Sequence, residues 1–454
     1  MSPIKIVPIT SQRFKALVAH SRSPAVGYIV EELAWFADEA ERLISVITLD
    51  LEDQDFGAVL LGRDEGRRYR CIDLTVSLPT FDEAKAWAEN AMRWHLRDGG
   101  AEFPQGDGTR GVDLFTPVVT HDRLHPDFVK LTSDITFLPA RSMINEIAPH
   151  FTDIDGNFVE QFQTTGFDAR LWELYIFSYL HEEQLFMDRT HDRPDFLVTK
   201  FGKTVAVEAT IVGRRQDNPP RFIKAPLAPL SREEVERRSE GEMPIRFGSP
   251  LYSKLKKRYW ELPHMDSVPL VLAIADFYED LSMQWSSPAL IEYLYGIKHG
   301  HHYEKDGSLV IDPTPIESHR LGEKVIPSGF FFQPESENIS AVLFSATGTI
   351  SKFNRLGRQA GFVPPGVLMF RMGVCHDPTL NASLPKQFGY QVTEESTETW
   401  AEGLSMFHNP NAKLPVPAEL FPSVAHYWFR DGRLGADMPD FHPYTSITLN
   451  MKHS

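Results

Sequence analysis

Runs of apolar residues broken by Asp and Gly turns mark the beginning of the chain. In residues 44–76, ISVITLDLEDQDFGAVLLGRDEGRRYRCIDLTV, the alternating and continuous apolar runs predict a meander of strands. Residues 81–96, FDEAKAWAENAMRWHL, then place Ala, Trp and Met at helical spacing, with Thr80 or Asp82 as the N-cap. We therefore expect residues 1–130 to form a separate α+β module.

A different pattern begins near residue 131, where helical segments precede two short apolar runs. Residues 168–184, DARLWELYIFSYLHEEQ, form the most apolar of these helices. In residues 193–212, RPDFLVTKFGKTVAVEATIV, the turn at Phe201, Gly202 and Lys203 joins two strands into a hairpin. A helix with Ser249 as N-cap and Pro250 at its first position follows, and then PLVLAIADF, a strand buried on both faces.

These elements suggest a core over residues 131–362. Two polar or irregular stretches, 214–247 and 280–335, interrupt it as predicted insertions, and residues 363–454 are expected to be a loop-rich C-terminal extension. Clustered histidines near residue 300 are expected to be exposed loop residues rather than metal ligands. The fold class predicted from this order is α/β.

Composition narrows the functional classes. The apolar content of 42% is enough to fill real cores, and two distant cysteines argue against a disulfide framework or a zinc ribbon. No stretch has the length and apolarity of a membrane helix or a secretory signal, so we expect a cytoplasmic protein that does not bind membranes. The net charge of −16 disfavours a polyanionic partner unless positive charge is concentrated locally.

Three carboxylates fall where a charge is costly. Glu208 lies within the second strand of the hairpin, Asp195 follows Pro194 at the start of the first, and Glu173 lies on the inward face of the apolar helix. Converging carboxylates repel each other unless a cation neutralises them, and all-oxygen ligands select Mg²⁺ or Mn²⁺. Such a centre is suited to phosphodiester hydrolysis. The alternative is that a buried arginine pairs with Glu173.

Over residues 170–277 the chain resembles the PD-(D/E)xK nuclease superfamily, which has a restriction-endonuclease-like core. The family order is a helix with a glutamate, a hairpin carrying Pro-Asp and (Asp/Glu)-x-Lys, a second helix and a further strand. The resemblance implies that Glu173, Asp195 and Glu208 bind metal. Thr210 occupies the position of the family lysine. Lys254, on the next helix, is the expected substitute, and Lys256 and Lys257 are neighbouring candidates.

Basic residues are concentrated on that same helix. Between residues 246 and 258 there is no acidic residue, and the predicted nucleic-acid-binding set is Lys254, Lys256, Lys257 and Arg258. Such a stripe is equally typical of an ordinary solvated helix face. Three further residues, Lys352, Arg355 and Arg358, are expected to extend the patch.

The function expected from these features is a divalent-metal-dependent nuclease. The resemblance favours DNA over RNA, allows a role in bacterial defence or DNA processing, and leaves a homodimer open. In this hypothesis the catalytic residues are Asp195, Glu208, Thr210 and Lys254. Two alternatives remain: a nuclease-like fold that binds nucleic acid or protein without cleaving, and a carboxylate cluster that serves only stability.

Overall fold

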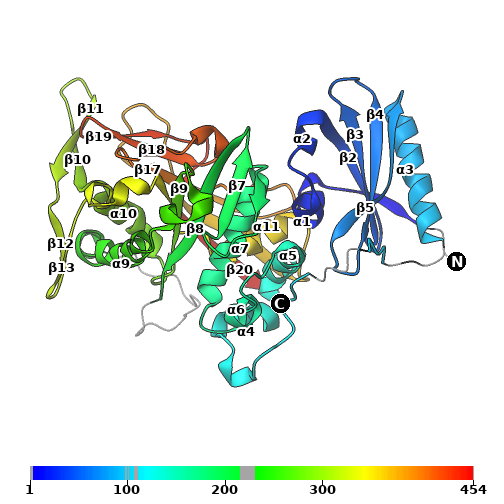
Figure 1. Cartoon of the computed structure of the whole chain (residues 1–454), viewed down its shortest axis with the longest axis horizontal. Coiled ribbons are helices and arrows are strands. Elements are labelled where there is room, and N and C mark those ends of the chain that lie inside the picture. Colours follow the sequence, from blue (N-terminus) through cyan, green and yellow to red (C-terminus); the bar gives the residue numbers. More distant parts are fainter. Residues whose placement is uncertain (1–3, 98–99, 101, 107–110, 215–230, 453–454) are drawn as a thin grey trace.

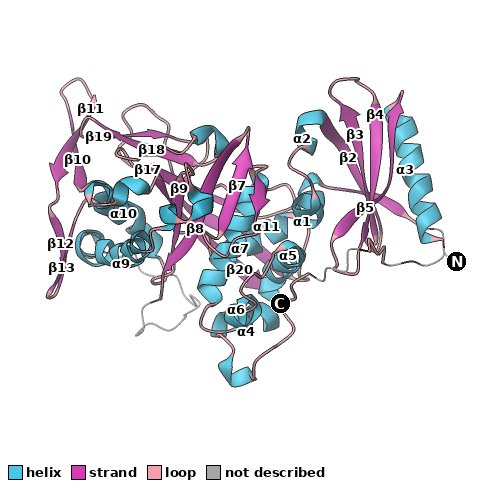
Figure 2. Cartoon of the chain, viewed as in Figure 1, coloured by secondary structure: helices cyan, strands magenta, loops and turns pink. Residues whose placement is uncertain are grey.

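The computed structural model describes residues 4–97, 100, 102–106, 111–214 and 231–452. It is a mixed α/β structure in which a small N-terminal sheet lies beside a larger central one (Figures 1 and 2). No helix among the described residues is both long and apolar enough to cross a membrane.

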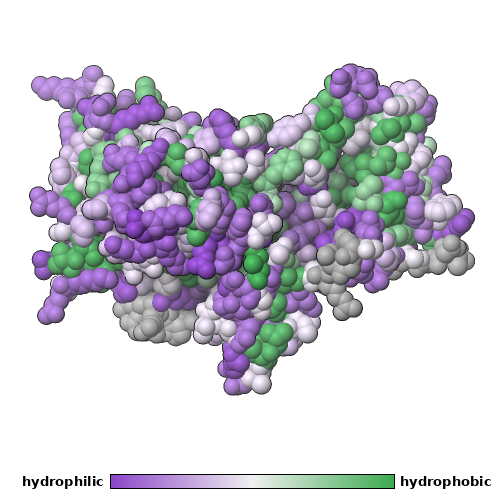
Figure 3. All heavy atoms as spheres, in the orientation of Figure 1, coloured by the Kyte–Doolittle hydropathy of each residue, from purple (hydrophilic) through white to green (hydrophobic). Residues whose placement is uncertain are grey.

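The N-terminal module is an antiparallel five-stranded meander. Its strands are β1 (Ile6–Ile9), β2 (Val30–Asp38), β3 (Leu43–Asp50), β4 (Phe56–Arg63) and β5 (Tyr69–Leu78). Helix α3 (Phe81–Leu96) covers one face through Ala84, Ala88 and Met92, and α1 (Ser11–Val18) packs on the other, near the short helix α2 (Val26–Ile29). The predicted meander is confirmed, as is the N-cap, because Thr80 Oγ1 accepts from the Glu83 N–H at 3.2 Å. Apolar side chains gather on the visible face of this module (Figure 3).

The central sheet has eight strands. In spatial order they are β19 (Arg433–Asp437), β18 (Ala425–Arg430), β17 (Ser405–His408), β14 (Ala341–Ser345), β9 (Leu270–Asp276), β8 (Lys203–Val212), β7 (Phe196–Lys200) and β6 (Phe186–Asp188). Strands β6, β7 and β8 are antiparallel, whereas β8, β9 and β14 run parallel. The predicted hairpin and the buried strand that follows it are confirmed. Its turn has positive φ at both Phe201 and Gly202, as tight hairpin turns require.

Helices cover both faces of the central sheet. On one face lie α5 (Leu138–Ile147), α7 (Phe167–Glu182) and α11 (Ile350–Gln359), and on the other lie α9 (Met243–Lys256) and α10 (Ser286–Tyr295). Strand β8 alternates between the two cores: Val205 and Val207 face α7, whereas Ala206 and Val212 face α9. The same alternation directs Glu208 toward the α9 side.

The remaining elements lie around this core. They are α4 (Pro126–Ser133), α6 (Phe158–Gln163), α8 (Arg232–Arg237), the hairpins β10 (Ile297–Tyr303) with β11 (Leu309–Pro315) and β12 (Ser318–Leu321) with β13 (Lys324–Pro327), and a sheet of β16 (Lys386–Gln391), β15 (Val367–Cys375) and β20 (Pro443–Lys452).

Several sequence expectations about these regions are wrong. Helix α9 begins at Met243, so Ser249 is not its N-cap and Pro250 lies inside the helix. Residues 243–247 of the predicted exposed insertion belong to this helix, and Met243 and Phe247 are buried. Residues 215–230 of that stretch lie outside the described residues. Within residues 280–335, α10 also belongs to the core.

The C-terminal segment is not loop-rich. Residues 363–452 hold six strands, and three of them, β17, β18 and β19, complete the central sheet beyond β14. The core therefore does not end at residue 362, as the sequence pattern predicted, but continues into the C-terminal segment. Short strands separated by prolines gave only a weak period-two signal, which is why the pattern alone missed them.

Candidate functional site

Asp195 and Glu208 lie side by side on the β7–β8 hairpin. The Asp195 N–H donates to Glu208 Oε2 at 3.1 Å, and the Ala209 N–H donates to Asp195 Oδ2 at 2.7 Å. This reciprocal pairing follows from the register, in which Phe196 is opposite Val207. The two carboxylates are thus fixed at one end of the hairpin, with Asp195 directly before β7 and Glu208 within β8.

Glu208 is buried but has partners from α9 and from the segment that follows this helix. Lys254 on α9 forms an ion pair with Glu208 Oε1, and the Tyr259 hydroxyl donates to the same oxygen at 2.5 Å. Burial and the adjacent Glu208 charge raise the pKa of Tyr259, so this phenol remains a donor. A glutamate inside a strand is therefore tolerated here because a cation and two further donors satisfy its oxygens.

Glu173 has a different partner. Arg170, one turn earlier on α7, donates to both of its oxygens from Nη1 at 2.8 and 3.0 Å. Burial raises the pKa of Glu173, an effect that Arg170 opposes and to which the charge of Glu208 adds. The structure thus contains the arginine partner that the sequence left open, and Glu173 remains within electrostatic range of the hairpin carboxylates.

Asp195 has a strongly raised pKa. Burial, together with the charges of Glu208 and Glu173, raises its pKa to about 8, although Lys254 acts in the opposite direction. Near neutral pH this carboxyl thus retains its proton in most molecules. An additional positive charge at this position would relieve the repulsion among the three acids.

The ability of these residues to hold a metal depends on which oxygens are available. Among the residues that the structure describes, no group of three His, Cys, Asp or Glu side chains is arranged to hold a metal ion. Glu173 is engaged by Arg170, and Oε1 of Glu208 by Lys254 and Tyr259. Asp195 with Oε2 of Glu208 gives a two-carboxylate oxygen set, which is the usual protein contribution to Mg²⁺ because this ion keeps several waters.

Thr210 lies two residues beyond Glu208 on the same face of β8. It lines a cavity of about 470 Å³ together with Lys254. The uncharged hydroxyl at the expected lysine position is thus next to a lysine that comes from α9.

The predicted nucleic-acid-binding residues do not form one surface group. Lys254 is partly buried against Glu208, whereas Lys256 and Lys257 are exposed and lie over the rings of Tyr252 and Tyr259. Arg258 pairs with Glu261 at 2.9 Å and Glu335 at 3.1 Å. Of these four residues, only Lys256 and Lys257 therefore present a charged group without an acidic partner among the described residues.

The expected extension of the basic patch by Lys352, Arg355 and Arg358 is wrong. Lys352 and Arg355 are fully buried and pair with Glu398 at 2.9 and 2.7 Å. Arg358 is also buried. These residues lie on α11 beneath the central sheet, so their helical spacing marks an internal charge cluster and not a surface.

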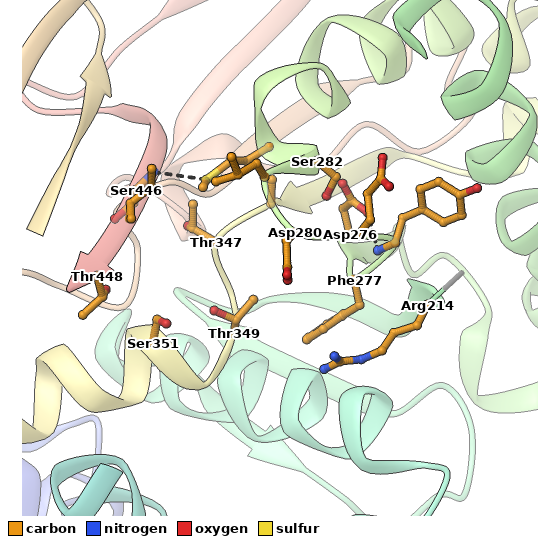
Figure 4. A pocket seen from close by; sticks show the side chains of 16 residues that line it. Arg214, Asp276, Phe277, Asp280, Ser282, Thr347, Thr349, Ser351, Ser446 and Thr448 are labelled. Atoms are coloured by element: carbon orange, nitrogen blue, oxygen red, sulfur yellow. Dashed lines mark hydrogen bonds between the residues drawn. The ribbon is translucent and has the colours of Figure 1, made fainter. Parts of the chain in front are cut away.

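A second polar cavity was missed by the sequence reasoning. It lies beyond the carboxyl ends of β8, β9 and β14, where Asp280, Thr349 and Arg214 surround the same space (Figure 4). Arg214 is held by Asp168, with Nε to Oδ2 at 2.6 Å, and also contacts Asp127. The carboxyl ends of parallel strands are the usual place for a ligand crevice, and the run of buried strands was the signal that could have indicated it.

Comparison with known proteins found no family model, no curated protein and no solved structure that matches this chain.

Proposed function

We propose that the protein is a divalent-metal-dependent hydrolase of phosphodiester bonds in nucleic acid, DNA in preference to RNA, with a restriction-endonuclease-like core. The observation that carries this proposal is the pairing of Lys254 with Glu208. It supplies, from a neighbouring helix, the positive charge that Thr210 lacks. Bacterial defence or DNA processing is the corresponding proposal for its biological role.

The order and direction of the elements support the proposal. Helix α7 with Glu173 precedes the hairpin β7–β8, and α9 with Lys254 leads into β9, which lies parallel to β8. This is the element order that the resemblance requires. Each proposed site residue comes from the element in which the family carries its counterpart, except Lys254, which replaces the strand lysine.

Asp195 and Glu208 would hold the metal, with Glu173 as a neighbouring acid. Their oxygen donors, and the repulsion that raises the pKa of Asp195, fit a hard divalent cation. When bound, Mg²⁺ or Mn²⁺ supplies positive charge to a phosphoryl oxygen and acidifies water. The metal-binding form of Asp195 is the carboxylate, so binding requires loss of the proton that this residue holds near neutral pH.

Lys254, Tyr259 and Thr210 have distinct roles in this proposal. The Lys254 ammonium orients the attacking water beside Glu208 and stabilises charge that develops on the phosphate. The Tyr259 hydroxyl fixes Glu208 Oε1. Thr210 lines the site without contributing charge.

The proposal is tested with end-labelled DNA and RNA in Mg²⁺ or Mn²⁺. We expect cleavage that EDTA abolishes and that Asp195→Asn lowers at least about 10²-fold, the usual loss for an electrostatic group in a catalytic site. Asp192→Asn is the matched control, because Asp192 is exposed on the same loop and pairs only with Arg193 among the described residues. An equal loss of cleavage in both variants, or no cleavage of any substrate by the wild type, would contradict the proposed nuclease activity.

A second candidate is a nucleic-acid- or protein-binding module on a nuclease-like fold. It is favoured by the ion pairs of both glutamates, since Arg170 pairs with Glu173 and Lys254 pairs with Glu208. Nucleic-acid binding without cleavage in any metal would select this candidate.

A further inference from the structure

A groove with positive charge runs along α9 away from Lys254. The cavity of about 470 Å³ lies between this helix and the end of β8. Among the described residues that line it none is acidic, although the whole chain carries a net charge of −16. The charged residues that line it are Arg246, Lys254 and Lys324.

One face of α9 forms the first wall. Arg246, Ser249 and Ser253 follow each other at helical spacing and are exposed, whereas Phe247 and Leu251 on the opposite face are buried in the core. The wall therefore offers a guanidinium and two hydroxyls to the groove. All of these groups can donate hydrogen bonds to phosphate oxygens.

The β12–β13 hairpin brings Lys324 to the other side. Its position is fixed by close packing on α9, because a Cβ on Gly248 would lie only 2.8 Å from Ile326 Cδ1. His319 on β12 also hydrogen-bonds through Nδ1 with the Glu240 carbonyl at 2.9 Å. Lys324 is thus held at the groove by a packed hairpin.

The cations of the two outer walls are available to a ligand. Lys324 is exposed and has no ion-pair partner among the described residues, and its neighbour Glu323 does not line the groove. Arg246 is 44% exposed and reaches its only described acidic partner, Glu242, at 3.6 Å. Neither charge is consumed by a tight internal pair.

We propose that this groove binds the phosphodiester backbone of one nucleic-acid strand and directs it to the Lys254–Glu208 pair. The inference rests on the proposed function for the direction of the strand. The volume is that of a small-ligand pocket, about 300–1,000 Å³, and suits one or two nucleotides of a single backbone. The substrate contacted here is therefore a strand, with Lys324 and Arg246 on opposite sides of it.

The experiment measures binding of a labelled 20-nucleotide single strand by fluorescence anisotropy in EDTA, at several salt concentrations. Each lost phosphate contact on a single strand lowers the salt slope by about 0.7, which weakens binding about fivefold at 0.1 M salt. We expect this loss for Lys324→Ala and for Arg246→Ala, and about twice the loss in slope for the double variant. Lys305→Ala is the control, because Lys305 is exposed on the turn of the separate β10–β11 hairpin.

Three results would overturn the inference: wild-type binding in both Lys324→Ala and Arg246→Ala, an equal loss in Lys305→Ala, or a mononucleotide that binds as tightly as the strand. A second variant, Gly248→Val, keeps every cation but displaces the hairpin and should reproduce the loss. Since EDTA prevents metal-dependent cleavage, the groove is tested apart from the nuclease. Strand binding by this groove in EDTA, combined with no cleavage of any substrate in Mg²⁺ or Mn²⁺, would reject the nuclease and retain the groove.

Discussion

Lys254 Nζ pairs with Oε1 of Glu208, although the two residues are 46 positions apart in the chain. The pair joins α9 to the middle of β8 next to Thr210, the position at which a charge was missing. Glu208 is thereby neutralised from the α9 side, while its second oxygen remains bonded to the Asp195 N–H. The proposed catalytic role of the carboxylates therefore depends on this one lysine.

Replacement of Lys254 by alanine should reduce single-turnover cleavage about 10²- to 10³-fold, as expected for loss of one electrostatic contact in the transition state. Affinity for Mn²⁺ should hold or increase, because the carboxylates lose a competing cation. Rapid-quench kinetics and calorimetric Mn²⁺ titration measure the two quantities. Full activity in Lys254→Ala would remove this residue from the mechanism.

Thr210→Lys in the Lys254→Ala background should recover part of the lost rate. The new ammonium would lie on the same face of β8 as Glu208, two residues further along the strand. The same assay measures the recovery, and Thr210→Met is the matched control because it adds similar length without charge. Equal rates in the two double variants would show that charge at this position is irrelevant.

Asp195→Asn should change the pH dependence of stability. The folded-state pKa of about 8 is above the unfolded value near 3.9. Protonation of Asp195 therefore stabilises the fold fully below about pH 4, and this stabilisation is lost as the pH rises through 8. Asparagine does not titrate and can still accept from the Ala209 N–H. The melting temperature of the variant relative to wild type should therefore increase from pH 5 to pH 9 in metal-free buffer. If the melting temperatures of the variant and of wild type change with pH in parallel, the raised pKa of Asp195 is contradicted.

Glu208→Gln should behave differently, because its carboxylate already has a cation. The substitution removes the ion pair with Lys254 and weakens the bond from Tyr259, so we expect a loss of about 1.5–3 kcal/mol in unfolding free energy, typical of hydrogen bonds to charged groups. Chemical denaturation at pH 7 measures it. A melting temperature equal to or above that of wild type would mean that the pair contributes no stability.

Local pattern predicted the elements near the candidate site well. The period-two alternation in β8 and the turn at Gly202 were sufficient to bring Asp195 next to Glu208, because register follows from a short hairpin. The partner of Glu173 was not decided by the sequence, since Arg170 is only one of several basic residues that could reach it. Arg170 is three residues before Glu173 on the same helix, a spacing at which side chains can meet, but which partner a glutamate takes also depends on packing, which spacing alone does not determine.

The sequence was least informative where tertiary context reversed the usual meaning of a residue. A proline usually marks the start of a helix, but Pro250 lies inside α9. The basic residues of α11 suggested a surface, yet the acidic partner that allows their burial, Glu398, is about forty positions away on a loop. No local signal connects Lys352 and Arg355 with that carboxylate.

The buried cluster around Glu398 gives the last prediction. Burial alone would raise the pKa of Glu398, but Arg355, Lys352 and Arg371 together hold it well below its usual range. A lowered pKa stabilises the fold above the unfolded value near 4.3, and this stabilisation is lost as the pH decreases. Glu398→Gln should therefore cost about 3–5 kcal/mol at pH 7, because it leaves buried cations without their anion. Denaturation between pH 3 and 7 should also show a shallower acid dependence than in wild type.

Lys352→Met is the comparison variant, and it should cost less because Arg355 and Arg371 keep Glu398 paired. If Glu398→Gln instead matches wild-type stability at both ends of this range, the cluster does not hold α11 in place.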